Sequence, residues 1–263
     1  ETDLGLDPKI ARRVAIKTLN YREFDTAQLN VIKERFFREA EAAGRLNHPN
    51  IVTVYDVGEE ADLAFIAMDY VEGKSLDRCV SETALLPIQE VYEIIIAVAD
   101  ALAYAHQQNI VHRDIKPGNI MYDQNSGQVK VADFGIARIV DDSKTKTGDM
   151  LGSPVYMSPE QLKGTRVSGA SDIYSLGVTF YQLLTGVLPF SGDSIANLAY
   201  QILNKKYVSV RELRPELSAG VVRVVNKALQ KEPSKRYHSA VEMADAVRSL
   251  LNRECRRDNR KAS

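Results

Sequence analysis

The residues best suited to chemistry lie in one short stretch, residues 114–119. Asp114, Lys116 and Asn119 place a carboxylate, an ammonium and an amide within six residues. Phosphoryl transfer needs such groups: a proton acceptor, a positive charge near the transferred group and an oxygen ligand for a metal ion. A solvated polar loop is the alternative interpretation, because loops of this composition are common. The order of the residue types favours chemistry.

A second candidate follows nineteen residues after Asp114, where residues 129–132 alternate as a strand does and lead into Asp133-Phe134-Gly135. An aspartate at a strand end, beside a glycine, can reach a hard cation that prefers oxygen ligands. Taken alone, this triplet is a weak signal, because such sequences occur in ordinary turns.

Lys17 and Glu39 form a third candidate. Lys17 ends the apolar run 14–16, where a surface lysine at a sheet edge is the alternative. Glu39 lies three residues after Phe36 and four before Ala43, so it projects close to the apolar stripe of its helix. Because burial of a lone charge is costly, we predict that Glu39 pairs with Lys17.

The elements that position these residues fall into two groups. Before residue 70, strand-like runs at 13–17, 51–55 and 63–68 flank one helix over 26–45, and residues 6–9 read as a turn. The apolar stripe of the helix is Ile32, Phe36, Ala40 and Ala43. After residue 73 the spacing predicts helices over 91–105, 173–184, 195–204, 219–230 and 239–251. Apolar pairs at 110–111 and 120–121 predict short strands on either side of the polar loop. A small β-rich lobe is therefore expected to precede a larger helical lobe.

Composition excludes several classes of protein. The 263 residues carry 34 basic and 35 acidic side chains, so the net charge of −1 gives no reason to expect nucleic acid as a partner. The two cysteines, Cys79 and Cys255, lack metal-type spacing and fit a reducing compartment. The most apolar stretch, 91–105, is too short to span a bilayer, and no signal peptide opens the chain. We expect a cytoplasmic protein, or the cytosolic domain of a larger, membrane-anchored one.

Four motifs occur in a telling order: VAIK at 14–17, HRDIKPGN at 112–119, DFG at 133–135 and SPE at 158–160. Together they resemble the protein kinase family, and most closely the eukaryotic-like (Hanks-type) Ser/Thr kinases of bacteria. The resemblance covers residues 1–251 and implies an α+β, bilobal fold. It divides the chain into a β-rich N-lobe with one long helix at 1–68, a hinge at 69–74, a mostly helical C-lobe at 75–252 and a polar tail at 253–263.

The resemblance also implies roles for individual residues. Asp114 would be the catalytic base, while Lys116 would stabilise the transferring phosphoryl group and Lys17 would hold the α- and β-phosphates of ATP. Asn119 and Asp133 would hold Mg²⁺. The residues implied in nucleotide binding are Ala15, Lys17, Glu39, Met68, Asp69, Val71, Met121 and Asp133. Those implied in structural support are Ala43, Val54, His112, Phe134, Glu160, Asp172 and Arg236.

The chain departs from the family pattern in two places. The glycine-rich hairpin that should cover the phosphates is missing, because residue 1 falls where the second strand of the family should end. We therefore expect a strand, a glycine-rich loop and a second strand upstream. The usual Ala-Pro-Glu is replaced by Ser158-Pro159-Glu160, which is a mild variation.

Lys116, two residues after the expected base, and Gly152-Ser153 resemble serine/threonine rather than tyrosine kinases. The expected partners are proteins that offer serine or threonine hydroxyls. Thr145 and Thr147 match the pair that bacterial relatives autophosphorylate, and Arg113 could bind the added phosphate. We predict phosphorylation there in trans, which requires self-association.

Alternatives of three other classes stay open at this point. A pseudokinase or scaffold would share the fold, but loss of a lysine, aspartate or asparagine would be expected. A small-molecule kinase of related fold would lack the long 133–160 loop and the SPE triplet. A pure interaction module would have no need for acidic and amide ligands that converge on one site.

Overall fold

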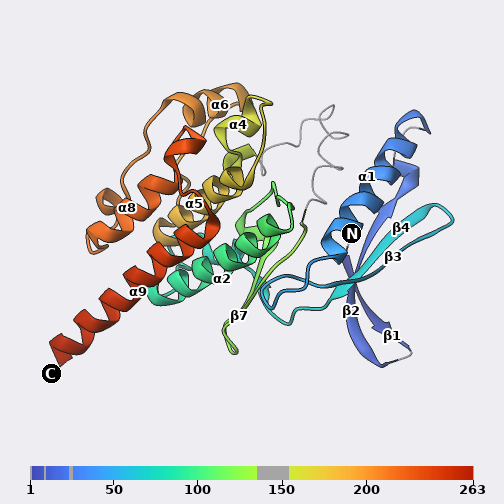
Figure 1. The fold of residues 1–263 in the computed structure, drawn as a ribbon, viewed down its shortest axis with the longest axis horizontal. Coiled ribbons are helices and arrows are strands. Elements are labelled where there is room, and N and C mark those ends of the chain that lie inside the picture. Colours follow the sequence, from blue (N-terminus) through green and yellow to red (C-terminus); the bar gives the residue numbers. More distant parts are fainter. Residues whose placement is uncertain (1, 9, 24–25, 135–153, 263) are drawn as a thin grey trace.

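The computed structural model describes residues 2–8, 10–23, 26–134 and 154–262, and gives only the backbone for some residues of the first and last helices. Figure 1 shows two lobes, with a sheet and one helix at the N-terminal end and a larger helical body that ends in the C-terminal helix. The prediction of a bilobal α+β fold is confirmed.

The N-lobe is built on an antiparallel sheet of order β1-β2-β4-β3. Its strands are β1 (Thr2–Asp7), β2 (Arg12–Asn20), β3 (Val54–Glu60) and β4 (Leu63–Asp69). The predicted strands at 13–17 and 63–68 lie within β2 and β4. Register places Ala15 opposite Met68 and Lys17 opposite Ile66.

Two strand predictions for the N-lobe are wrong. Residues 2–7 form β1, which pairs with β2 along its length. The strand that precedes β2 was expected to end at residue 1, and it instead extends to Asp7. Leu4 and Leu6 are exposed, so β1 is stabilised by its backbone hydrogen bonds to β2 and not by a buried apolar face. Such a strand shows no apolar alternation in its sequence. The run predicted at 51–55 is also displaced: β3 begins at Val54, and Ile51 forms a parallel bridge with Val131 of the C-lobe.

Helix α1 (Thr26–Gly44) packs its apolar stripe on the sheet. Ile32, Phe36 and Ala40 are buried, as the sequence predicts, and they contact a cluster that includes Ala64 and Ile66 of β4. At 25 cal/mol per Å², each large apolar side chain buried here contributes on the order of 1.5–3 kcal/mol. This packing fixes the helix that bears Glu39 on the sheet that also contains β2, the strand of Lys17.

The C-lobe is helical, as predicted. Its helices are α2 (Ile88–Gln107), α4 (Pro159–Leu162), α5 (Gly169–Thr185), α6 (Ile195–Asn204), α7 (Val210–Leu213), α8 (Ala219–Ala228) and α9 (Ala240–Ala262). Helix α5 is almost completely buried, and it forms the core of the lobe together with the buried face of α2. Within the described residues, no helix is both long and apolar enough to cross a membrane.

Helix α9 continues past Leu251, into the segment 253–263 that was expected to form a polar tail. The extra turns are held against α2. Tyr92 donates a hydrogen bond of 3.0 Å to Glu254, and Gln89 lies 3.7 Å from the sulfur of Cys255. Arginine-rich composition did not reveal this contact, because the partners lie more than 160 residues away.

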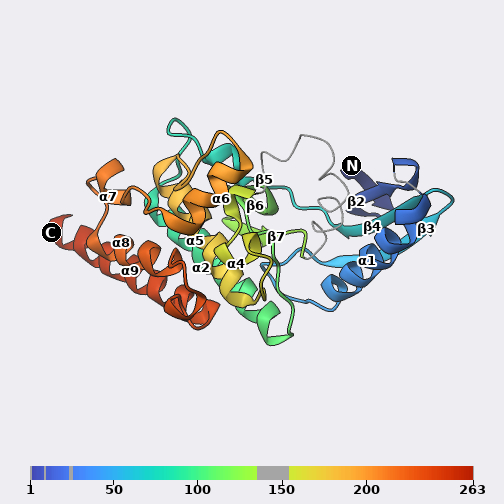
Figure 2. The same cartoon turned by 90° about the horizontal axis from the view of Figure 1, so that it is seen from above.

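A small sheet of order β5-β6-β7 lies between the helices and the N-lobe (Figure 2). Its strands are β5 (Lys74–Ser75), β6 (Ile120–Asp123) and β7 (Gln128–Val131). The predicted strands on the far side of the polar loop are therefore present. The strand predicted at 110–111 is wrong, because Ile110 instead donates a backbone hydrogen bond of 2.9 Å to Ala105 and terminates α2.

Candidate active site

The polar loop between α2 and β6 brings its three predicted residues into one hydrogen-bonded group. Lys116 Nζ lies 2.7 Å from Asp114 Oδ2. Asn119 Nδ2 donates to the same Oδ2 at 2.9 Å and to the Asp114 carbonyl at 2.7 Å. Residues Pro117–Asn119 form one turn of 3₁₀ helix, which turns Asn119 back toward Asp114. A carboxylate, an ammonium and an amide therefore meet at one point.

Asp172 holds this loop from beneath. It lies near the start of α5, whose N-terminus is capped by Ser168, and it is fully buried. Its two oxygens accept hydrogen bonds from the backbone N–H groups of His112 at 2.9 Å and Arg113 at 2.8 Å. Charge-assisted bonds of this length are the strong ones, and they fix the backbone immediately before Asp114.

Arg113 adopts a φ of 71°, a left-handed conformation that residues with a side chain rarely take. Asp133 has a φ of 61°. Such strain persists only where the surrounding structure enforces it, and it occurs often at functional sites. Both residues flank the group formed by Asp114, Lys116 and Asn119.

His112 is a packed core residue, as the sequence suggested, and not a base. Its Nε2–H donates to the carbonyl of Ala132 at 2.9 Å, while its Nδ1 accepts from the backbone N–H of Asp114 at 3.2 Å. The ring lies 4.5 Å from that of Phe134. Both ring nitrogens are therefore in use, and the neutral imidazole braces the loop.

Asp133 follows the end of β7 by two residues and accepts a hydrogen bond of 2.7 Å from Lys17 Nζ. This pair joins the N-lobe sheet to the C-lobe, and about a quarter of each side chain is exposed (25% and 26%). The predicted partner of Lys17 was Glu39. Its side chain lies outside the described residues, so that pairing stays a prediction.

Asn119 and Asp133 lie close together, because the backbone N–H of Ala132 donates to the Asn119 carbonyl at 2.8 Å. The amide nitrogen of Asn119 is held by Asp114, which leaves its oxygen available as a ligand. Mg²⁺ commonly takes one or two protein oxygens and completes its shell with phosphates and water. The described residues include no group of three or more His, Cys, Asp or Glu side chains that could hold a metal ion. The two residues fit a metal bound together with a phosphate ligand.

The residues expected to bind the adenine come from both lobes. Ala15 and Met68 are paired across β2 and β4, and Met68 is buried. Met121 lies on β6, opposite Lys130 of β7. Asp69 ends β4, and the chain then passes through Val71 to β5 at Lys74. Gly152, Ser153, Thr145 and Thr147 lie outside the described residues.

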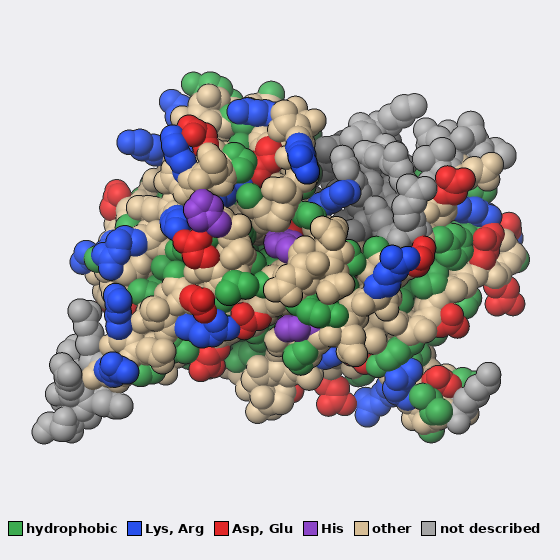
Figure 3. Space-filling model, in the orientation of Figure 1, with side chains coloured by type: hydrophobic (Ala, Val, Ile, Leu, Met, Phe, Trp, Pro, Cys, Tyr) green, Lys and Arg blue, Asp and Glu red, His purple; other side chains and the backbone are tan. Residues whose placement is uncertain are grey.

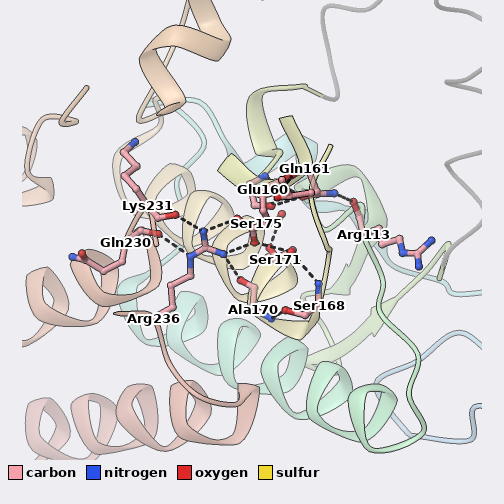
Figure 4. Close-up of polar contacts among 12 residues, drawn as sticks. Arg113, Glu160, Gln161, Ser168, Ala170, Ser171, Ser175, Gln230, Lys231 and Arg236 are labelled. Atoms are coloured by element: carbon pink, nitrogen blue, oxygen red, sulfur yellow. Dashed lines mark hydrogen bonds and ion pairs between the residues drawn. The ribbon is translucent and has the colours of Figure 1, made fainter. Parts of the chain in front are cut away.

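A buried ion pair supports the helical side of the site (Figure 4). Arg236 binds Glu160 through two parallel hydrogen bonds of 2.7 and 2.8 Å, and both side chains are almost fully buried. Ser171 donates a third bond of 2.7 Å to Glu160. Burial alone would raise the pKa of the Glu160 carboxyl, but the bonds from Arg236 and Ser171 outweigh it and lower that pKa. Glu160 and Arg236, which the family resemblance implied in structural support, thus form a buried salt bridge.

Two supporting residues were missed in the sequence. Gln161 forms a capping box with Ser158 at the start of α4 and donates from Nε2 to the Arg113 carbonyl at 2.8 Å, so it ties the ion pair to the loop. The S-x-x-Q spacing of Ser158 and Gln161 is a capping signal that could have found it. His106 contacts Asp172 at 2.8 Å. No local pattern marks His106, because its partner lies 66 residues away.

Comparisons with known proteins agree with this geometry. The family described as "Protein kinase domain" matches residues 4–248. Serine/threonine-protein kinase PrkC of Bacillus subtilis is 41% identical over 250 residues, which are 95% of this chain and 38% of that protein. Serine/threonine-protein kinase PknB of Mycobacterium tuberculosis is 42% identical over 256 residues, 94% of this chain and 40% of that protein. The chain thus spans about two-fifths of the length of these relatives.

The fold is also similar to that of a solved structure, Rad53 residues 1–466 in complex with AMP-PNP. The TM-score is 0.76 with 26% sequence identity, and the match covers 93% of this chain and 60% of that one.

Proposed function

Since the chain belongs to the protein kinase family, we propose that it transfers the γ-phosphate of ATP to serine and threonine hydroxyls of proteins. The observation that carries this proposal is the grouping of Asp114, Lys116 and Asn119 on an anchored loop, beside Asp133 and Lys17. This is the set of groups that the phosphoryl-transfer template of the family requires.

Asp114 is suited to accept the proton of the acceptor hydroxyl. Its Oδ2 already contacts the Lys116 ammonium and accepts a hydrogen bond from the Asn119 amide, and none of the described residues donates a hydrogen bond to Oδ1. The free oxygen of an oriented carboxylate can take a proton in the transition state, which typically contributes a factor of about 10²–10⁴ to the rate. The hydrogen bonds to Oδ2 prevent the carboxylate from rotating.

Lys116 and Lys17 provide positive charge on either side of the reacting group. Lys116 approaches from the catalytic loop and Lys17 from β2 of the N-lobe. Charge that is already positioned stabilises the phosphoryl group in the transition state without reorganisation at the moment of reaction. Asn119 and Asp133 would hold Mg²⁺, which neutralises phosphate charge when bound.

The nucleotide is proposed to lie where the two lobes meet. Ala15 and Met121 would contact the two faces of the adenine, Met68 would line the back of the site, and the backbone of Asp69 and Val71 would bind the edge of the base. The AMP-PNP complex of the structurally similar Rad53 supports a nucleotide in this fold. The described parts of β2, β4 and β6 carry these residues.

Regulation by phosphorylation of Thr145 and Thr147 is part of the proposal. Arg113 supports it: its backbone is fixed by Asp172 and Gln161, while its guanidinium has no partner among the described residues and points away from the network in Figure 4. An exposed arginine on a rigid backbone can bind a phosphate through two hydrogen bonds. Phosphorylation in trans would require two copies to meet, and a cytosolic setting fits the two free thiols, Cys79 and Cys255.

Labelled ATP tests the proposed function directly. With Mg²⁺ and ATP labelled on the γ-phosphate, the chain should label casein and itself, and acid hydrolysis should release phosphoserine and phosphothreonine. Mass spectrometry should locate phosphate on Thr145, Thr147 or both. Nucleotide binding without any label on protein would indicate a pseudokinase. Label found only on a small-molecule acceptor, or only on tyrosine, would also overturn the proposal.

A further inference from the structure

A second ion pair joins the lobes, at the back of the segment expected to bind adenine. Lys130 of β7 donates to Asp69 Oδ2 at 2.7 Å, and it also lies 3.4 Å from the carbonyl oxygen of Ile51. The side chains are only 13% and 24% exposed. Breaking a largely buried pair leaves one charge without compensation, so this contact has a strong influence on local geometry.

Asp69 is held from the N-lobe side as well. Tyr55 of β3 donates its hydroxyl to Asp69 Oδ1, and the guanidinium of Arg12 stacks 3.4 Å from the centre of the Tyr55 ring. The backbone N–H of Asp69 donates to Thr53 at 2.9 Å. Burial alone would raise the pKa of the Asp69 carboxyl, but the bonds from Lys130 and Tyr55 outweigh it and lower that pKa. Asp69 therefore stays charged and fixed between the lobes.

Within the described residues, ion pairs link the N-lobe sheet to β7 and the residues that follow it at two places. The first, called the front pair, joins Lys17 of the N-lobe to Asp133. The second, called the back pair, joins Lys130 of the C-lobe to Asp69. The front pair consists of residues proposed to bind phosphate and metal, so its contact competes with the nucleotide. The side chains of the back pair have no such second role, because only the backbone of Asp69 is proposed to contact the nucleotide.

We propose that Lys130 and Asp69 form a latch that positions the backbone of residues 69–71 for the adenine and keeps the lobes at the right distance. In this account Lys130 is a positioning residue that touches neither nucleotide nor protein acceptor. The inference rests on the proposed ATP-dependent function. Loss of the latch should weaken nucleotide binding while the chemical step, which depends on the separately anchored catalytic loop, stays intact.

Steady-state kinetics of Lys130→Met and Asp69→Asn test the latch. Each variant should raise the KM for ATP by about three- to thirtyfold with kcat within about twofold of wild type. The KM for the protein acceptor should not change. The double variant should lose little more than either single one, because both remove the same contact. Lys130→Arg, which can still bind Asp69, should restore most of the ATP affinity.

Lys227→Met is the control, because Lys227 forms a more exposed ion pair of 2.5 Å with Glu242, far from the hinge. Its KM for ATP should equal that of wild type. The latch is refuted if Lys130→Met binds ATP as wild type does, if Lys227→Met shows the same KM shift, or if the losses from Lys130→Met and Asp69→Asn simply add. If Lys130→Met does not fold, Tyr55→Phe takes its place, with the same KM increase expected. A wild-type chain that transfers no phosphate would instead refute the proposed function.

Discussion

The two halves of the candidate site are held in different ways. On the C-lobe side, Asp172 fixes the backbone of His112 and Arg113 from a fully buried position, and the Arg236–Glu160 pair supports the same region through Gln161. On the N-lobe side, the described contact of the Lys17 ammonium is one hydrogen bond to Asp133, and about a quarter of each side chain is exposed. The proposed base is therefore fixed by the fold of one lobe, whereas the proposed contact of Lys17 with the phosphates would depend on how the lobes approach each other.

This contrast has a physical reason. The helices of the C-lobe bury a large apolar core, and the charged side chains buried beside it, Asp172, Glu160 and Arg236, are all paired. The N-lobe has a smaller separate core and a sheet with exposed apolar residues on β1. We therefore expect motion to be easier in the N-lobe, where the proposed nucleotide would enter and leave. Figure 3 shows basic and acidic side chains interspersed across the visible face of both lobes, with no extended region of one sign.

The largest effect on the rigid half should come from Arg236→Met. It leaves Glu160 buried without its partner, and loss of one member of a buried pair typically costs about 3–5 kcal/mol. Urea unfolding measures the loss. Lys235→Met is the control, because the Lys235–Glu232 pair next to it is exposed and should contribute little. Equal stability of Arg236→Met and wild type would show that the C-lobe half is not held as described.

The same pair makes a prediction about pH. The pKa of Glu160 is lowered in the fold, so the stability from this pair is complete above the unfolded-state pKa of about 4.3 and is lost as pH falls through the lower folded-state pKa. In Arg236→Met, burial without the guanidinium should raise that pKa. The stability gap between variant and wild type should therefore be widest above about pH 5 and narrow toward about pH 3. A gap independent of pH would contradict the assignment.

A smaller effect, on kcat, is expected from Asp172→Asn. The amide keeps the shape of the side chain but removes the negative charge of the carboxylate, which accepts hydrogen bonds from two backbone N–H groups. Hydrogen bonds to charged groups contribute about 1.5–3 kcal/mol. We expect kcat to fall about tenfold to a hundredfold, with the KM for ATP nearly unchanged because the N-lobe does not depend on Asp172. A change in the KM for ATP with kcat unchanged would contradict the view that Asp172 supports only the C-lobe half of the site.

The smallest effect concerns coupling within the N-lobe half. If Lys17 and Glu39 form a pair, the activity losses of Lys17→Met and Glu39→Gln should be non-additive by about 0.5–3 kcal/mol in a double-mutant cycle. Strictly additive losses would mean that Lys17 relies on Asp133 instead, and that the grip on the phosphates lies wholly between the lobes.

Much of this arrangement could be predicted from the sequence. Periodicity gave the two lobes and the main helices, and the order of residue types in 112–119 identified the loop. Other features could not be predicted, because they depend on distant partners. Asp172 and His106 are 66 residues apart, and the left-handed conformations of Arg113 and Asp133 are imposed by contacts from other elements. β1 was missed because it lacks a buried apolar face. The Lys130–Asp69 pair could not be predicted either, because its two residues lie on different strands, 61 residues apart in the sequence.

Single-turnover phosphoryl transfer by Asp114→Asn tests the central claim most directly, with ATP saturating and its affinity measured separately. An amide of the same shape preserves the contacts of the loop but cannot accept the hydroxyl proton. The rate should fall by about a hundredfold to ten-thousandfold, while ATP affinity changes little. Transfer at the wild-type rate would contradict the account, and so would a loss explained entirely by weaker ATP binding.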